Sequence, residues 1–115
     1  MQATLIGVDD QGVRRRYHLT EFPVTVGRNE DADVHLSDPW VSGMHCKIDL
    51  VDGTLIVEDT FSRNGTRVNG CYVRRSPLMP GDELAVGSLA FQVAYDRCSV
   101  NRPPQACYTA APEGR

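Results

Sequence analysis

Apolar and polar residues alternate in short runs along most of this chain, and turn residues separate one run from the next. The spacing of apolar residues by three and four positions that is typical of a helix is rare. Period-two alternation between turns is typical of antiparallel strands. The pattern therefore predicts an all-β chain, with strands at residues 3–8, 15–19, 24–27, 34–36, 45–50, 54–58, 66–68, 72–73, 83–86 and 89–95.

Three turn signals support these strands. Asp52-Gly53 and Asn69-Gly70 each separate two strand patterns, and both residues of such a hairpin turn adopt positive φ. Gly87-Ser88 closes the last hairpin. Many short strands with tight turns favour a two-sheet antiparallel β-sandwich of about ten to eleven strands, with its binding loops at one end. The predicted core consists of inward-facing residues: Ile48, Leu50, Leu55, Val57, Leu84, Val86, Phe91 and Val93.

One domain is expected over residues 1–95. A chain of 115 residues can build one core and is too short for two. From residue 96 onward the alternation stops and prolines increase, so residues 96–115 are expected to form a flexible C-terminal tail. Thr109 in this segment is a candidate phosphorylation site for recognition by the domain itself, and the alternative is a plain flexible terminus.

Charge and composition limit the classes of partner. Hydrophobic residues make up 41% and charged residues 23% of the chain, as in ordinary globular proteins. A net charge of -3 argues against general nucleic-acid binding, which requires a basic face. The run Arg14-Arg15-Arg16 is the only basic cluster, and it suits a charged sheet edge that resists aggregation. We expect no nucleic-acid partner and no membrane partner.

The four cysteines do not indicate a metal site. Cys46 lies in a strand pattern and suits a small buried apolar position. Cys71, Cys98 and Cys107 are too scattered for the close pairs of a zinc site. The N-terminus lacks the basic start and long apolar run of a signal peptide, so we expect a cytoplasmic protein with reduced thiols, no metal and no cofactor.

Two polar loops and one arginine carry the candidate chemistry. The loops are Val41–His45 and Ser62–Thr66, and Arg28 precedes both. A phosphothreonine carries nearly two negative charges and three strong acceptor oxygens. Arg28 offers a planar cation, Ser42 a hydroxyl donor, and Asn64 an amide that both donates and accepts. These residue types indicate recognition of a phosphorylated side chain without bond breaking.

Five separated motifs follow one another along the chain: Gly27-Arg28, Ser42-x-x-His45, Glu58-Asp59, the run Ser62–Gly70 and the run Leu78–Gly87. Together they resemble the motifs of forkhead-associated (FHA) domains, which are β-sandwiches that bind phosphothreonine peptides. The resemblance extends from about residue 5 to residue 95. It implies a non-catalytic adaptor in Ser/Thr kinase signalling. The expected partner is a phosphothreonine-containing protein or peptide, and a Ser/Thr protein kinase acts upstream.

The resemblance also implies a role for each matching residue. Arg28 and Ser42 would bind the phosphate, and Arg63 would also reach it. Asn64 would hold the peptide backbone beside the phosphothreonine, and Asn69, counted with the same binding set, would brace these loops. Four further residues would mainly support the site: Gly27, His45, Gly65 and Thr66. His45 would be buried and would fix the serine loop, which is the loop Val41–His45 that carries Ser42.

Gly43 departs from the family pattern, in which the residue after the serine is usually polar or basic. Its backbone N–H can still bind phosphate, and Arg63 can supply the missing charge. A charge-assisted hydrogen bond contributes about 1.5–3 kcal/mol, so the loss of one would weaken binding by roughly ten- to a hundredfold.

Selectivity beyond the phosphate would come from residues around these loops. Burial of the threonine methyl group contributes about 0.8 kcal/mol, so a strong preference over serine would also need the stiffer χ1 of threonine. Trp40 either packs beneath the serine loop or contacts the peptide. Four acidic residues nearby predict a preference for apolar or basic residues after the phosphothreonine: Glu30, Asp31, Asp33 and Asp38.

Two other functions are weighed against phosphate recognition. Ser42, His45 and Asp59 include the residue types of a hydrolase triad, but no Gly-x-Ser-x-Gly motif surrounds the serine. A phosphate-independent protein–protein interaction or self-association module would instead use a sheet face. The combined presence of Arg28, Ser42 and Asn64 favours phosphate recognition, because a sandwich that only packs does not need these donors at adjacent loops.

Overall fold

The chain folds into strands joined by turns and loops. The computed structural model describes residues 3–8 and 12–96, and no helix that could span a membrane occurs in these ranges. All ten expected strands are present, with ends within one residue of the predicted ones. The strands are β1 (Ala3–Val8), β2 (Arg14–Leu19), β3 (Val24–Gly27), β4 (Val34–His35), β5 (Cys46–Val51), β6 (Thr54–Asp59), β7 (Thr66–Val68), β8 (Cys71–Val73), β9 (Arg75–Leu78), β10 (Glu83–Val86) and β11 (Leu89–Tyr95).

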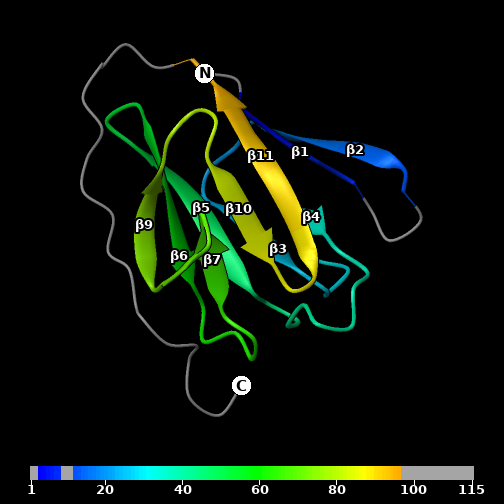
Figure 1. Cartoon of the computed structure of the whole chain (residues 1–115). Helices are drawn as coiled ribbons and strands as arrows, with labels where there is room; N and C mark the ends of the chain where they lie inside the picture. The colour runs from blue at the N-terminus through cyan, green and yellow to red at the C-terminus, as the bar shows by residue number, and fades with distance from the viewer. Residues whose placement is uncertain (1–2, 9–11, 97–115) are drawn as a thin grey trace.

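Two sheets pack face to face and confirm the predicted sandwich (Figure 1). One sheet has six strands in the order β2-β1-β11-β10-β7-β8, and the other has five in the order β4-β3-β5-β6-β9. The pairs are antiparallel, except that β3 and β4 pair in parallel, which the sequence pattern does not predict. A parallel pair requires the chain to return to the same end before the second strand. Residues 28–33 make this return as a loop at the edge of the sheet.

β9 is the one strand that the sequence pattern misses. Pro77 lies within it, and proline lacks the N–H that a central strand needs on both sides. β9 pairs only with β6 and forms an edge of the five-stranded sheet, so Pro77 is tolerated there. The strand becomes recognisable only once its place at the edge is known.

The predicted hairpin turns adopt the expected backbone geometry. Asp52 and Gly53 have φ of 50° and 77°, and Asn69 and Gly70 have φ of 52° and 84°. Gly87, the first residue of the last turn, has φ of 62°, as a type II′ turn requires. These turns fix the pairing register of the strands that they join.

Apolar side chains from both sheets fill the space between the layers. The predicted core residues all belong to this cluster, although Leu50 is only partly buried. Cys46 is fully buried, as predicted, and burial raises the pKa of its thiol. Cys46 and Cys71 are both free thiols. The predictions for Cys98, Cys107 and Thr109, and nearly all of the expected tail, lie outside the described residues.

Tyr95, at the end of β11, connects the two sheets by hydrogen bonds. Its buried hydroxyl donates to the carbonyl oxygen of Leu78 in β9 and accepts the N–H of Leu55 in β6 at 3.3 Å. Two main-chain groups of the five-stranded sheet are thereby satisfied from the six-stranded sheet, which fixes the relative position of the layers.

The Tyr95→Phe substitution should therefore lower the free energy of unfolding by about 1–3 kcal/mol, because it leaves buried backbone groups unsatisfied. Urea denaturation of the variant and the wild type measures the change. Tyr72→Phe is the matched control, since the Tyr72 side chain is only half-buried and its hydroxyl makes no hydrogen bond within the described residues. Equal losses in the two variants would contradict the bridging role of Tyr95.

Candidate functional site

Loops from distant parts of the chain meet at one end of the sandwich and are held by hydrogen bonds. The N–H of Arg28 in the β3–β4 loop donates to the carbonyl oxygen of Ser42 in the β4–β5 loop at 3.0 Å. The N–H of Arg63 in the β6–β7 loop donates to Ser42 Oγ at 2.8 Å. The Asn64 side chain donates to the carbonyl oxygen of Trp40 at 2.8 Å. Arg28, Ser42, Arg63 and Asn64 are thus brought together.

Gly27 permits the close approach of the first two loops. A Cβ atom at this position would lie 2.2 Å from the carbonyl oxygen of Gly43 and 2.9 Å from its carbonyl carbon. Both atoms belong to the backbone, so neither can turn aside. The absence of a side chain at Gly27 therefore sets how closely Arg28 lies to the serine loop.

His45 connects the serine loop to the β6–β7 loop. Its Nδ1 accepts the backbone N–H of Ser42 at 3.1 Å, and its Nε2 lies 2.8 Å from the carbonyl oxygen of Gly65. A carbonyl oxygen only accepts, so Nε2 carries the proton and the imidazole is neutral. The residue is fully buried, and burial lowers the pKa of His45 below its ordinary value of 6.5. Through these two bonds His45 joins the loop that carries Ser42 to the loop that carries Gly65.

Asp59 shapes the β6–β7 loop, a role that the sequence pattern does not predict. Its carboxylate accepts the N–H of Ser62 at 3.1 Å, the hydroxyl of Ser62, and the hydroxyl of Thr66 at 2.8 Å. Ser62 Oγ in turn accepts the N–H of Gly65 at 2.9 Å. Aspartate and serine side chains at turns often bond to nearby backbone groups, so Asp59 and Ser62 at the end of a predicted strand are a signal that could have identified the pair.

Several hydrogen-bond donors remain available around Ser42. The exposed Arg28 and Arg63 guanidinium groups make no hydrogen bond or ion pair within residues 3–8 and 12–96. Ser42 Oγ already accepts a backbone N–H, so its own proton is free to point outward. The backbone N–H of Gly43 likewise has no acceptor among the described residues. The site therefore presents two cations, a hydroxyl and an amide N–H to solvent.

Asn69 lies apart from these donors. It occupies the β7–β8 turn, at the end of β7 opposite the Ser62–Thr66 loop. Its amide donates to Asp82 Oδ1 at 3.1 Å and accepts the N–H of Glu83 at 2.9 Å. The side chain therefore anchors β7 to the start of β10, a bracing role, while Asn64 alone of the two asparagines lies beside the serine loop.

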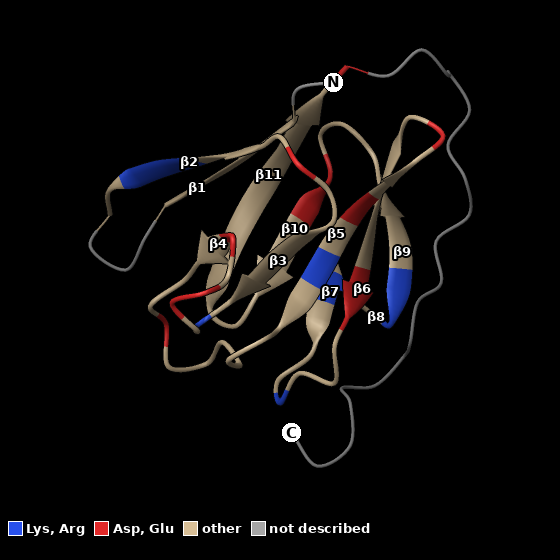
Figure 2. Cartoon of the chain, turned by 180° about the vertical axis from the view of Figure 1, so that it is seen from behind, with Lys and Arg blue, Asp and Glu red and all other residues tan. Residues whose placement is uncertain are grey.

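Charges of opposite sign flank the loops (Figure 2). Glu30, Asp31 and Asp33 are exposed on the β3–β4 side, and the tip of the β6–β7 loop is basic. Asp33 also accepts the N–H and the hydroxyl of Thr25 at 2.9 and 3.0 Å, which holds that loop against β3. The fourth acidic residue named above, Asp38, is buried and accepts the N–H of Ser88 at 2.8 Å, so it contributes little to the exposed acidic surface.

Trp40 is exposed rather than packed beneath the serine loop. Its side chain is 60% exposed, whereas its carbonyl oxygen is fixed by Asn64. Of the two alternatives for this indole, the structure disfavours packing and leaves the ring accessible beside the donors. No group of His, Cys, Asp and Glu side chains suited to a metal ion occurs in the described ranges.

Stability should decrease at acidic pH because of His45. Its folded-state pKa is lower than its unfolded-state value, so the unfolded chain binds the proton more readily. The contribution of His45 to the free energy of unfolding is complete above about pH 6.5. It declines as the pH falls toward the folded-state pKa, and the free energy of unfolding then changes by at most about 1.4 kcal/mol per pH unit. Urea denaturation between about pH 5 and 8 measures this slope.

The His45→Gln variant should lose this component of the slope, and His35→Gln, which changes an exposed histidine, should keep it. An unchanged slope in His45→Gln would contradict the assignment. If that variant does not fold, an NMR titration of the wild-type His45 ring decides, because a pKa at or above 6.5 would be equally contradictory.

Curated relatives match about two thirds of the chain. The FHA domain-containing protein FhaA of Mycobacterium tuberculosis is 36% identical over 78 residues, which cover 68% of this chain and 15% of that protein. The glycogen accumulation regulator GarA of Mycolicibacterium smegmatis is 38% identical over 72 residues, which cover 63% of this chain and 46% of that protein. The matched region thus spans less than half the length of either relative.

Solved structures and a family model agree with these matches. A domain analysed for phosphothreonine-dependent FHA domain interactions superposes with a TM-score of 0.75 and 32% identity, covering 84% of this chain and 98% of that one. The family model described as FHA domain matches residues 24–87, more than half of the chain, and includes every loop of the site. The chain belongs to the FHA domain family.

Proposed function

We propose that this domain binds phosphothreonine-containing segments of partner proteins and acts as a non-catalytic adaptor in Ser/Thr kinase signalling. The observation that carries the proposal is the convergence on Ser42. Its hydroxyl oxygen accepts the Arg63 N–H, which leaves the hydroxyl proton free to donate to a ligand. Arg28 and Arg63, in the two neighbouring loops, carry exposed guanidinium groups that make no hydrogen bond or ion pair within the described residues. A phosphate dianion needs this combination of cations and short neutral donors.

Each residue has a distinct role in the proposal. Arg28 and Arg63 supply charge, while the Ser42 hydroxyl and the Gly43 N–H complete the donors to the phosphate oxygens. One N–H of the Asn64 side-chain amide donates to the carbonyl oxygen of Trp40. The amide oxygen is then available to accept a backbone N–H of an extended peptide. Asn69 acts at a distance, by bracing β7.

The relatives support this assignment. FHA domains as a family include a domain solved for its phosphothreonine-dependent interactions, and the matched region of GarA belongs to a protein named as a regulator. The proposed partner is therefore a protein phosphorylated on threonine by a Ser/Thr kinase, and no nucleic acid or membrane takes part. The proposal also includes a cytoplasmic location, in keeping with the free thiols Cys46 and Cys71.

The hydrogen bonds of His45 support a role without catalysis. In a hydrolase triad the imidazole accepts a proton from the serine hydroxyl. Here Nδ1 accepts the backbone N–H of Ser42, and Nε2 donates to the Gly65 carbonyl. Asp59 bonds to Ser62 and Thr66 rather than to the imidazole. Both ring nitrogens thus serve to fix loops.

A phosphate-independent interaction module is the second candidate function. The outer face of the six-stranded sheet has an open hollow of about 620 Å³, whose lining includes Ile6, Val8 and Ala90. A partner or a second copy could bind there. Arg14 lines this hollow, but none of the loop donors Ser42, Gly43 and Asn64 does, so phosphate dependence of binding separates the two functions.

Matched peptides test the proposal. A phosphothreonine peptide should bind at least tenfold more tightly than its unmodified counterpart and a fewfold more tightly than its phosphoserine counterpart, and Arg28→Ala or Ser42→Ala should weaken its binding by roughly ten- to a hundredfold. Isothermal titration calorimetry measures both effects. Arg16→Ala is the control, since Arg16 is an exposed arginine on the edge strand β2, away from the loops. Equal affinity for all three peptides would favour the sheet-face module.

Gly43→Arg should tighten phosphopeptide binding by about tenfold, because it adds a cation beside Ser42. The new Cβ would lie 2.8 Å from the side-chain oxygen of Asn29, which is exposed and can rotate away. Gly43→Ala introduces the same Cβ without the charge and separates crowding from attraction. A loss of affinity in Gly43→Arg equal to that in Gly43→Ala would show that the added charge does not reach the phosphate.

A further inference from the structure

Phe61 combines two unusual properties at the edge of the proposed site. Its side chain is 90% exposed, the highest value among the exposed large apolar residues of the described chain. Its backbone has φ of 58°, in the left-handed region that bulky side chains avoid. The other non-glycine residues with positive φ in the described ranges are Asp52 and Asn69, which are hairpin-turn residues of types that tolerate this conformation.

The residues on either side of Phe61 are bonded inward and hold it in this position. The N–H of Thr60 donates to the carbonyl oxygen of His45 at 3.0 Å, and its hydroxyl donates to the carbonyl oxygen of Met44 at 2.7 Å. Ser62 is fully buried and bonded to Asp59. With both neighbours fixed, the Phe61 ring is directed to solvent, and the loop cannot relax to bury it without losing these bonds.

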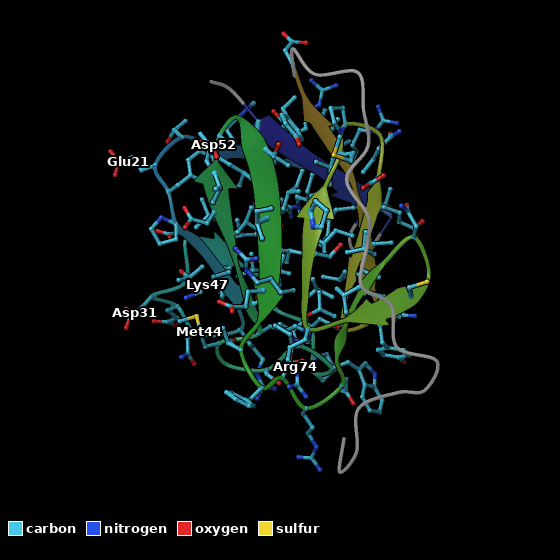
Figure 3. The ribbon with its side chains drawn as sticks, turned by 90° about the vertical axis from the view of Figure 1, so that its left-hand side faces the viewer. Glu21, Asp31, Met44, Lys47, Asp52 and Arg74 are labelled. Carbon is cyan, nitrogen blue, oxygen red and sulfur yellow. The ribbon has the colours of Figure 1, made fainter. Side chains whose placement is uncertain are left out.

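Met44 lies beside the Thr60–Phe61 segment, because its carbonyl oxygen accepts the Thr60 hydroxyl at 2.7 Å, and it adds a second exposed apolar side chain to this part of the loop end. In the β5–β6 ladder Cys46 pairs with Asp59, and the bond between Thr60 and His45 continues the same register for one more pair. The residues that follow His45 and Thr60 outward, one in each segment, are Met44 and Phe61. Met44 is 39% exposed, and Figure 3 shows it toward the end of the molecule opposite to Asp52. We call these two residues the Met44–Phe61 pair.

The Met44–Phe61 pair is continuous with the phosphate donors. Met44 follows Gly43 directly, and Phe61 is two residues before Arg63, so its Cα lies within about 7 Å of the Arg63 Cα. An extended peptide advances about 3.3 Å per residue. A peptide anchored by its phosphate at Ser42 would therefore bring a side chain two or three positions away over this pair.

We propose that the Met44–Phe61 pair is a specificity-determining subsite that binds an apolar side chain of the same phosphorylated segment. The proposal rests on the phosphothreonine-binding function proposed above. An exposed aromatic ring held rigidly beside an anchoring site loses little conformational entropy when a ligand covers it. The exposed acidic residues of the β3–β4 loop, including Asp31, discourage an acidic side chain nearby, so the occupant is an aliphatic or aromatic residue.

A panel of phosphothreonine peptides tests the subsite. Each of the three positions before and after the phosphothreonine is in turn leucine in an otherwise serine-flanked peptide. The wild type should prefer leucine by about tenfold at one position, the effect of removing roughly 55 Å² of apolar surface from water. The same preference should disappear in Phe61→Asn, because asparagine accepts positive φ but is polar.

Two further variants complete the design. Phe61→Gly should also lose the leucine preference while its melting temperature stays equal to or above that of the wild type, since glycine tolerates the left-handed backbone. If Phe61 served only stability, Phe61→Gly would lower the melting temperature and keep the leucine preference. Val51→Ser, which changes an exposed apolar residue at the β5–β6 hairpin, should keep the wild-type preference.

The outcomes separate this inference from the function on which it rests. Phosphate-dependent binding with the same leucine preference in Phe61→Asn, or with no preference at any position, overturns the subsite alone. Equal binding of phosphorylated and unmodified peptides overturns both. Self-association of the peptide-free wild type that Phe61→Asn abolishes would assign the pair to a contact between copies of the chain and likewise overturn the proposal.

Discussion

The site depends on one buried imidazole. His45 accepts the Ser42 N–H with one ring nitrogen and donates to the Gly65 carbonyl with the other, so it connects two loops whose residues are about twenty positions apart in the chain. A neutral ring can do this at little cost, because both of its polar atoms are satisfied. A charged side chain in the same place would need a counter-ion within the core. The position of the Ser42 hydroxyl relative to the Arg63 N–H follows from this bridge.

Hydrogen bonds between backbone groups and short side chains make the loop end rigid before any ligand arrives. Asp59 holds the β6–β7 loop from within, and Gly27 allows the β3–β4 and β4–β5 loops to approach each other. The cations, by contrast, are exposed and uncommitted. Exposed charges in water contribute modestly, so binding would depend on neutral donors whose positions are already fixed, with Arg28 and Arg63 adding attraction for a dianion. This division suits reversible recognition.

One residue of the loop end, Phe61, is unfavourable for stability in two respects. Phe61 combines a backbone conformation unfavourable for a bulky residue with a side chain that packs against almost nothing in the described structure. Elsewhere in the described residues positive φ occurs only at asparagine, aspartate or glycine, which tolerate this conformation. Conflicts of this kind concentrate at functional sites, because neighbouring interactions hold the strained residue in place. At Phe61 these interactions are the bonds of Thr60 and Ser62.

Sequence alone determined the strands, most of the core and the hairpin turns, because alternation and turn chemistry are local properties. It missed β9, since Pro77 is acceptable only at a sheet edge and edges are not visible in one dimension. It named the loop residues that converge, but it grouped Asn69 with Asn64, although β7 separates them. Only the tertiary structure decided which donors meet, that Asp59 organises its loop, and that Phe61 points to solvent. These depend on contacts between segments distant in the chain, which no local pattern encodes.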